Sequence, residues 1–239
     1  MGPRGPSTAL TDFVRCVKRV ALDGIVGGRQ DAPESGGKVD NTSRAGLIGS
    51  ITIGAIGLWA VLQAALAVAT VMLGIGGGDT VLDLVNQLAL TGLVGFLICG
   101  VLFFVWSYQA MSVAHQLFPS LTISPAGSIG WYFVPIASLW MPYRAMSDIW
   151  KGSARGAETP RATALLVSWW VLWLGRTILS WVERLTVQSA PDVSAILLLL
   201  ACAAGIAGAV LLMIIIHRIN TMQARRFDAS IFDLSLIHI

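Results

Sequence analysis

Four long apolar segments account for most of the chain after residue 44. They run from about residue 45 to 73, 84 to 108, 161 to 182 and 192 to 217. A helix needs about 20 mostly apolar residues to cross the roughly 30 Å hydrocarbon core of a bilayer, and each segment meets that length. The pattern therefore predicts an all-α membrane protein with four transmembrane helices that are separated by polar connections.

The stretch of residues 124–151 departs from this pattern. Its apolar part, residues 129–142, is only 14 residues long and contains two prolines. Pro135 and Pro142 each remove a helical hydrogen bond, and the carbonyl groups that they free would need partners at membrane depth. We therefore expect a proline-broken aromatic helix that is interfacial or re-entrant. The alternative is a kinked span that is held by its neighbours.

Two local features belong to the same stretch. Ser124 followed by Pro125 is typical of a helix start, because the hydroxyl caps a backbone N–H and proline fits the first turn. Read at helical spacing, its apolar side chains share a face that we expect to pack on the spans or to sit in the interface. That face carries Tyr132, Ile136, Leu139, Tyr143, Met146 and Trp150.

Three regions follow from these assignments. Residues 1–44 read as a cytoplasmic amphipathic segment, with a short helix near residues 10–20 or, alternatively, a loosely ordered tail, followed by a linker rich in Gly, Asp and Ser. Residues 45–226 form the membrane domain, and residues 227–239 form a tail. The last six residues, 234–239, resemble the translated end of a sequencing adapter, so we expect no functional role for His238.

A family resemblance can be placed on the same stretch. Residues 131–150 read WYFVPIASLWMPYRAMSDIW, and residues 168–175 read SWWVLWLG. Together they resemble the signature of a bacterial multi-pass membrane family known as domain of unknown function 4328, over roughly residues 45–226. The resemblance implies an architecture and no established reaction. The signature residues are Trp131, Pro135, Trp140, Pro142, Tyr143, Arg144 and Trp150.

This chain departs from the family pattern at two places. Ser138 stands where we expect asparagine, and residues 108–110 read Tyr-Gln-Ala where relatives tend to carry arginine.

Composition agrees with a membrane protein and excludes several other classes. Hydrophobic residues make up 55% of the chain and charged residues 12%, whereas soluble domains carry about 25% charged residues. The net charge of +3 is too small and scattered for a nucleic-acid partner. The cysteines Cys16, Cys99 and Cys202 have no C-x-x-C spacing, so we expect no disulfide framework, metal site or cofactor.

Basic residues indicate the orientation in the membrane. They lie before the first span, between residues 144 and 161, and after the last span, whereas the connections near residues 76 and 188 hold only Arg184. Cytoplasmic segments carry the excess of Lys and Arg. We therefore expect a multi-pass protein of the bacterial plasma (inner) membrane with both termini in the cytoplasm.

Arg176 is the strongest candidate for a binding residue, because it is the one ionisable group well inside a predicted span. A charge at that depth is costly unless it pairs or reaches the interface. It could bind an anion. Alternatively, its role is structural, with the guanidinium stacked on Trp173 and paired with Glu183 or Asp83.

The remaining sequence signals leave two classes of function open. No catalytic motif is present, so we do not expect an enzyme. The first class of function is therefore a non-enzymatic scaffold, sensor or regulatory membrane module. The alternative is a small transporter or channel with the broken stretch as its gate and Arg176 at an anion site. Small residues such as Gly46, Gly54, Gly205 and Gly208 predict close packing of spans. Partners are then the lipid bilayer, a second copy of the chain or other membrane proteins.

Overall fold

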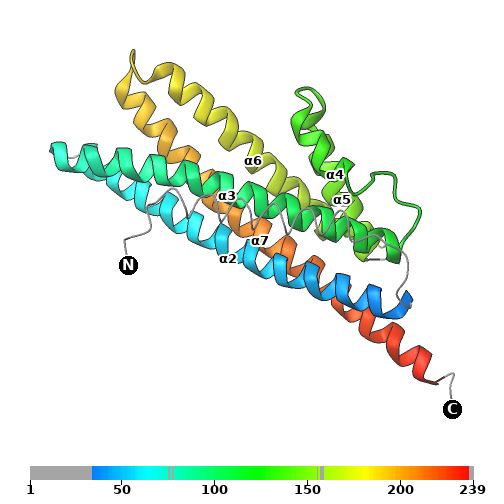
Figure 1. Cartoon of the computed structure of the whole chain (residues 1–239). Coiled ribbons are helices and arrows are strands. Elements are labelled where there is room, and N and C mark those ends of the chain that lie inside the picture. Colours follow the sequence, from blue (N-terminus) through cyan, green and yellow to red (C-terminus); the bar gives the residue numbers. More distant parts are fainter. Residues whose placement is uncertain (1–33, 75, 77, 155, 157–158, 237–239) are drawn as a thin grey trace, which may run out of the picture. The chain divides into compact units, whose positions relative to one another are not determined.

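The computed structural model describes residues 34–74, 76, 78–154, 156 and 159–236, with side chains described between Ser43 and Arg226. The helix predicted near residues 10–20 lies outside these ranges. The described residues contain helices and no strand. In chain order the elements are α2 (Glu34–Gly74), α3 (Asp79–Leu117), α4 (Gly127–Gly130), η1 (Trp131–Phe133), η2 (Ala137–Leu139), α5 (Met141–Ser153), α6 (Pro160–Thr186) and α7 (Pro191–Leu236) (Figure 1).

Four of these helices are long and apolar enough to cross a membrane, which confirms the predicted fold class. All four exceed the predicted limits, most of all at the start of α2 (Glu34), at the end of α3 (Leu117) and at the end of α7 (Leu236). In α3 the extension is held by packing, since Ala110 and Met111 are fully buried. The candidate spans are Ser43–Gly74, Asp79–Leu117, Pro160–Thr186 and Pro191–Arg226.

Helices α2 and α3 form an antiparallel pair. The indole N–H of Trp59 in α2 donates to the backbone oxygen of Gly92 in α3 at 3.0 Å. Two turns earlier in α2, the hydroxyl of Thr52 donates to the backbone oxygen of Leu102, further along α3, at 3.4 Å. The two contacts move in opposite directions along the two helices, so the chain reverses at the connection near Gly76.

Helices α6 and α7 form a second antiparallel pair. Near the connection, the hydroxyl of Ser194 in α7 donates to Glu183 Oε1 in α6 at 3.3 Å. Further from it, Gly208 of α7 faces Leu172 of α6 closely enough that a Cβ on the glycine would lie 3.6 Å from the leucine Cβ. The small residues predicted to pack in the last span therefore do so.

The small residues predicted to pack in the first span are only partly correct. A Cβ added to Gly46 or Gly54 would meet no atom of the described residues within 4 Å, so these two glycines do not pack against another described helix. Gly49 packs instead, because it lies directly against the side-chain amide of Asn220 in α7. The Asn220 Oδ1 also accepts a hydrogen bond from Trp106 Nε1 of α3 at 3.0 Å. This amide therefore joins α2, α3 and α7.

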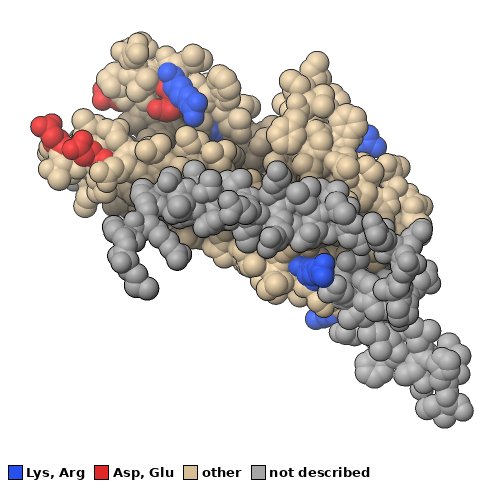
Figure 2. Space-filling model, in the orientation of Figure 1, with Lys and Arg blue, Asp and Glu red and all other residues tan. Residues whose placement is uncertain are grey.

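Charged side chains separate toward the two ends of the bundle. On the face shown in Figure 2 the acidic side chains gather at one end. We call the end with the α2–α3 and α6–α7 connections the acidic end and the opposite end the basic end. The acidic end carries Asp79, Asp83, Glu183 and Asp192, with Arg184; the basic end carries Arg44, Arg144, Lys151, Arg161 and Arg218, with Asp148.

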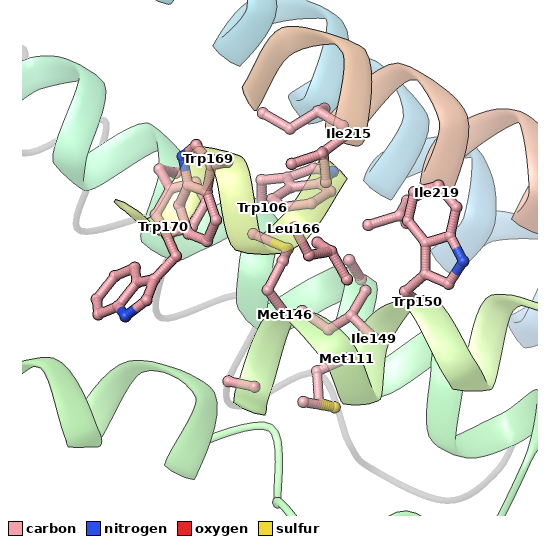
Figure 3. Close-up of a cluster of buried hydrophobic side chains, with 14 of the residues drawn as sticks. Trp106, Met111, Met146, Ile149, Trp150, Leu166, Trp169, Trp170, Ile215 and Ile219 are labelled. Carbon is pink, nitrogen blue, oxygen red and sulfur yellow. The ribbon is translucent and has the colours of Figure 1, made fainter. Parts of the chain in front are cut away.

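The most tightly packed core lies toward the basic end, where α5 meets α3, α6 and α7. Trp106 of α3, Ile149 of α5 and Ile219 of α7 are 0% exposed, and Met146 of α5 is 1% exposed. Figure 3 shows these side chains converging from their helices, with Leu166 of α6 among them. The core therefore fixes α5 onto three of the long helices.

Candidate functional site

The prolines break residues 124–151 into short helical pieces, as predicted. Pro135 lies in the turn between η1 and η2, after Val134 with extended backbone angles (φ −94°, ψ 111°). Pro142 falls in the first turn of α5, where its missing N–H is not needed. The predicted capping at the start is also present, because Ser124 Oγ accepts from the backbone N–H of Gly127 at 3.1 Å.

The continuous apolar face predicted for this stretch is wrong. Ile136 is 71% exposed and Leu139 56% exposed, whereas Met146 and Trp150 in α5 are buried. The reason is the turn at Pro135, which ends the helical periodicity on which the predicted face depended. Only the α5 part keeps the expected register.

The first half of the broken stretch is attached to the spans by aromatic contacts. Tyr132 of η1 lies edge-on to Phe104 of α3, with ring centroids 5.1 Å apart. The neighbouring Phe133 lies 5.7 Å from the same ring. In η2 the backbone oxygen of Leu139 accepts from Trp170 Nε1 of α6 at 3.1 Å. This bond satisfies a carbonyl that the short helix leaves without an internal partner.

The second half, α5, is attached by polar contacts as well as by the core. Gln223 of α7 is 1% exposed, and its Nε2 donates to the backbone oxygen of Ala110 at 3.0 Å and to Ser153 Oγ at 2.9 Å. On the other side of α5, Asp148 Oδ2 accepts from Thr122 Oγ1 at 3.0 Å. These bonds connect α5 to α7 and to the segment before α4, and the same Gln223 also connects α7 to α3.

A cavity of about 470 Å³ lies among α2, α3, α6, α7 and η1. Aromatic and aliphatic side chains make up nearly all of its wall, together with Gly100, Gly205 and Gly208. Tyr132 and Phe133 of η1 form part of the wall, so the broken stretch and the spans share this space. Among the described residues that line the cavity, Arg176 is the only Lys, Arg, Asp or Glu. We call this space the Arg176 cavity.

The guanidinium of Arg176 is held by aromatic rings. Its Cζ lies 4.9 Å from the Trp59 ring centroid and 5.3 Å from that of Phe96. Such cation–π contacts stabilise a desolvated guanidinium. The sequence suggested Trp173 as the stacking partner, but that ring stacks on Trp170 with centroids 4.8 Å apart. The Nε of Arg176 is buried and has no hydrogen-bond partner among the residues that the structure describes.

Gly205 of α7 makes the room that the Arg176 side chain occupies. A Cβ at this position would lie 2.8 Å from Arg176 Nε, 2.9 Å from its Cδ and 3.3 Å from the Trp59 ring. Glycine is therefore needed here for close approach, because any larger side chain would displace the arginine.

The structure does not bring Arg176 together with Asp83 or Glu183. Phe96, over which the guanidinium lies, follows Asp83 by 13 residues, which is about 20 Å along α3 at 1.5 Å per residue. Asp83 is exposed at the acidic end, and Glu183 accepts the hydrogen bond from Ser194. The remaining signature residues lie elsewhere: Trp131 and Trp140 are 38% and 48% exposed, and Arg144 is exposed.

Sequence reasoning found Arg176 but missed Trp59, Phe96 and Gly205. Trp59 offered a signal, because it is the only aromatic residue in the first span. Gly205 was predicted to be a packing residue, but its contact with Arg176 was not predicted.

Among the described residues no group of three or more His, Cys, Asp or Glu could hold a metal ion. Cys99 and Cys202 are free thiols, and Cys16 lies outside the described residues.

Comparison with known proteins gives one family. Residues 79–221 match the family described as Domain of unknown function (DUF4328). Neither the curated proteins nor the solved structures contain a match. The matched residues begin with α3 and include η1, α5 and Arg176, whereas α2 with Trp59 precedes them. Because the match covers more than half of the chain and the four apolar helices fit a multi-pass membrane protein, the chain belongs to the DUF4328 family.

Proposed function

We propose that this protein is a non-enzymatic regulatory module of a bacterial inner membrane, which senses what occupies the Arg176 cavity. The observation that carries the proposal is the shared wall: Tyr132 and Phe133 line the cavity and belong to the stretch that leads into α5. An occupant would therefore contact both the spans and the element that reaches the basic end.

The attachment of α5 supports a signalling role for that element. Helix α5 is hydrogen-bonded to α7 through Ser153 and packs closely on α3, where Gly152 faces Ala114. A shift of η1 would therefore act on the packed end of the bundle. Arg144 is an exposed charged side chain of α5 through which a partner protein at the membrane surface would be recognised.

The proposed orientation puts the basic end in the cytoplasm, together with both termini. The basic end holds Arg44, Arg144, Arg161 and Arg218, and the positive-inside rule assigns such an end to the cytoplasm. In this orientation α5 faces cytoplasmic partners, whereas the acidic end faces outward.

Transport is the second candidate, and Arg176 is the observation that favours it. A lone guanidinium at membrane depth would attract an anion. The apolar wall of the cavity argues against a conducting path, because ions that pass need polar groups to replace their hydration.

The sensing proposal is tested by filling the cavity permanently. Gly100 lines the cavity and has open space around it, so Gly100→Leu should mimic an occupant. Gly175→Leu is the matched control, because Gly175 also has open space but does not line the cavity. Hydrogen exchange of the α5 amides, measured by mass spectrometry in lipid nanodiscs, should change several-fold in Gly100→Leu alone. Unchanged exchange in both variants contradicts sensing, and anion flux that depends on Arg176 would favour transport.

A further inference from the structure

We propose that the Arg176 cavity binds a long-chain monocarboxylate, with its carboxylate on Arg176 and its chain along α3 toward Tyr132. The proposal rests on the proposed sensing function and names the ligand class for the same site.

The first argument is the unmet charge of Arg176. Its Nε is buried without a hydrogen-bond partner, and the rings of Trp59 and Phe96 supply no acceptor oxygen. Glu183 is occupied by Ser194, and Asp83 is about 20 Å away along α3. The cation–π contacts offset part of the cost of this charge, but a guanidinium within a membrane is usually also paired with an anion or a polar group. Its planar fork matches a carboxylate through two parallel hydrogen bonds.

The second argument is the depth of the site. Trp59 lies 15 residues before the end of α2, and Gly205 lies 14 residues after the start of α7. Both helices therefore place the guanidinium about 21–22 Å from the acidic end, well within the span. A phospholipid headgroup at this depth would bury further polar atoms, and the described wall offers them almost no partners. A monocarboxylate has no polar atoms besides the carboxylate, so none would be buried without a partner.

The third argument is the shape and opening of the cavity. Its volume of about 470 Å³ lies in the range of small-molecule sites. It extends from Phe96 beside Arg176 to Phe104 beside Tyr132, about 12 Å along α3. Among the wall residues, Leu97 is 59% and Phe133 72% exposed, so the cavity opens sideways toward the lipid. An apolar chain can therefore enter from the bilayer.

The test uses palmitate as the probe, with the full chain in nanodiscs of neutral phosphatidylcholine. Hexadecanol is the control ligand, since it has the same chain without a carboxylate. Arg176→Gln should weaken palmitate binding about tenfold or more, because a charge-assisted bidentate contact is lost, and should leave hexadecanol binding unchanged. Arg184→Gln is the control variant, because Arg184 lies exposed on the same helix and does not line the cavity.

Two further variants keep the test independent of folding. Arg176→Lys retains the charge but lacks the planar fork, so it should bind palmitate weakly while remaining as stable in detergent as the wild type. Gly205→Ala should also weaken binding by displacing the arginine. Gly57→Ala is its control, because the nearest atom to the new Cβ is 3.7 Å away, on the flexible side chain of Met213.

Each outcome separates the ligand class from the proposed function. Equal affinity for palmitate and hexadecanol, or palmitate binding that Arg176→Gln leaves intact, would overturn the monocarboxylate. A phospholipid that co-purifies one to one and excludes palmitate would overturn it as well. If palmitate binds as expected but Gly100→Leu leaves α5 exchange unchanged, the site stands and the sensing function fails. If Gly100→Leu alters α5 and palmitate does not bind, the function stands and the ligand class fails.

Discussion

Replacing Gly152 with alanine adds a methyl group where α5 packs directly against α3. The new Cβ would lie 2.6 Å from Ala114 Cβ, 2.9 Å from Leu121 Cδ1 and 3.0 Å from the Ala114 backbone oxygen. Ala114 has no rotatable side chain, so it cannot move aside, and the two helices must separate instead.

The expected loss follows from two opposing terms. Overpacking of a tight core costs about 1–3 kcal/mol, and alanine recovers up to about 1 kcal/mol of helix propensity over glycine. The net loss of unfolding free energy relative to the wild type is therefore about 0–2 kcal/mol, and the loss relative to a glycine-to-alanine change without the clash is about 1–3 kcal/mol. Gly175→Ala in α6 is the matched control, because its new Cβ meets nothing within 4 Å and only the propensity gain remains.

Thermal unfolding in one detergent, followed by near-ultraviolet circular dichroism, measures both variants against the wild type. For a chain of this size, the loss of about 1–3 kcal/mol relative to Gly175→Ala places the apparent Tm of Gly152→Ala about 2–12 °C below that of Gly175→Ala. Gly175→Ala should melt at or slightly above the wild-type temperature. A Gly152→Ala protein as stable as Gly175→Ala would refute the close α5–α3 contact and the attachment of α5 that depends on it.

Two other predictions concern the basic end and the orientation. Trp106→Phe removes the hydrogen bond to Asn220 and should lower the free energy of unfolding by about 1–3 kcal/mol, since the amide oxygen loses its donor. In a double-mutant cycle with Asn220→Leu the two losses should be strongly non-additive. Additive losses would contradict the hydrogen bond. A cysteine at Gln188 should react with an impermeant maleimide on intact cells, whereas one at Ser120 should react only after permeabilisation. Labelling of Ser120→Cys from outside would reverse the proposed topology.

The sequence was sufficient for the four spans, because apolar length alone determines which helices can cross a bilayer. The break at Pro135 was also predictable, since proline removes a helical hydrogen bond wherever the segment lies. The exposed positions of Ile136 and Leu139 were not, because they depend on the direction in which the chain turns after the break.

The cavity could be predicted only in part. The cost of a charge within a span identified Arg176 in advance. Its surroundings come from three other helices, and no periodicity within one helix indicates that Trp59, Phe96 and Gly205 meet there. Asp83 was a reasonable ion-pair partner for Arg176 by charge, but it lies about 20 Å along α3 from Phe96, the ring that the guanidinium contacts.

The most direct test of the central claim, that an occupant of the Arg176 cavity acts on α5, is hydrogen exchange with the probe present. The full chain in nanodiscs would be measured with palmitate and with hexadecanol at equal concentration. We expect palmitate to slow exchange in residues 131–133 and to alter it in α5, with no effect in Arg176→Gln. Exchange in α5 that is identical with and without palmitate, under conditions where palmitate is bound, would contradict the account.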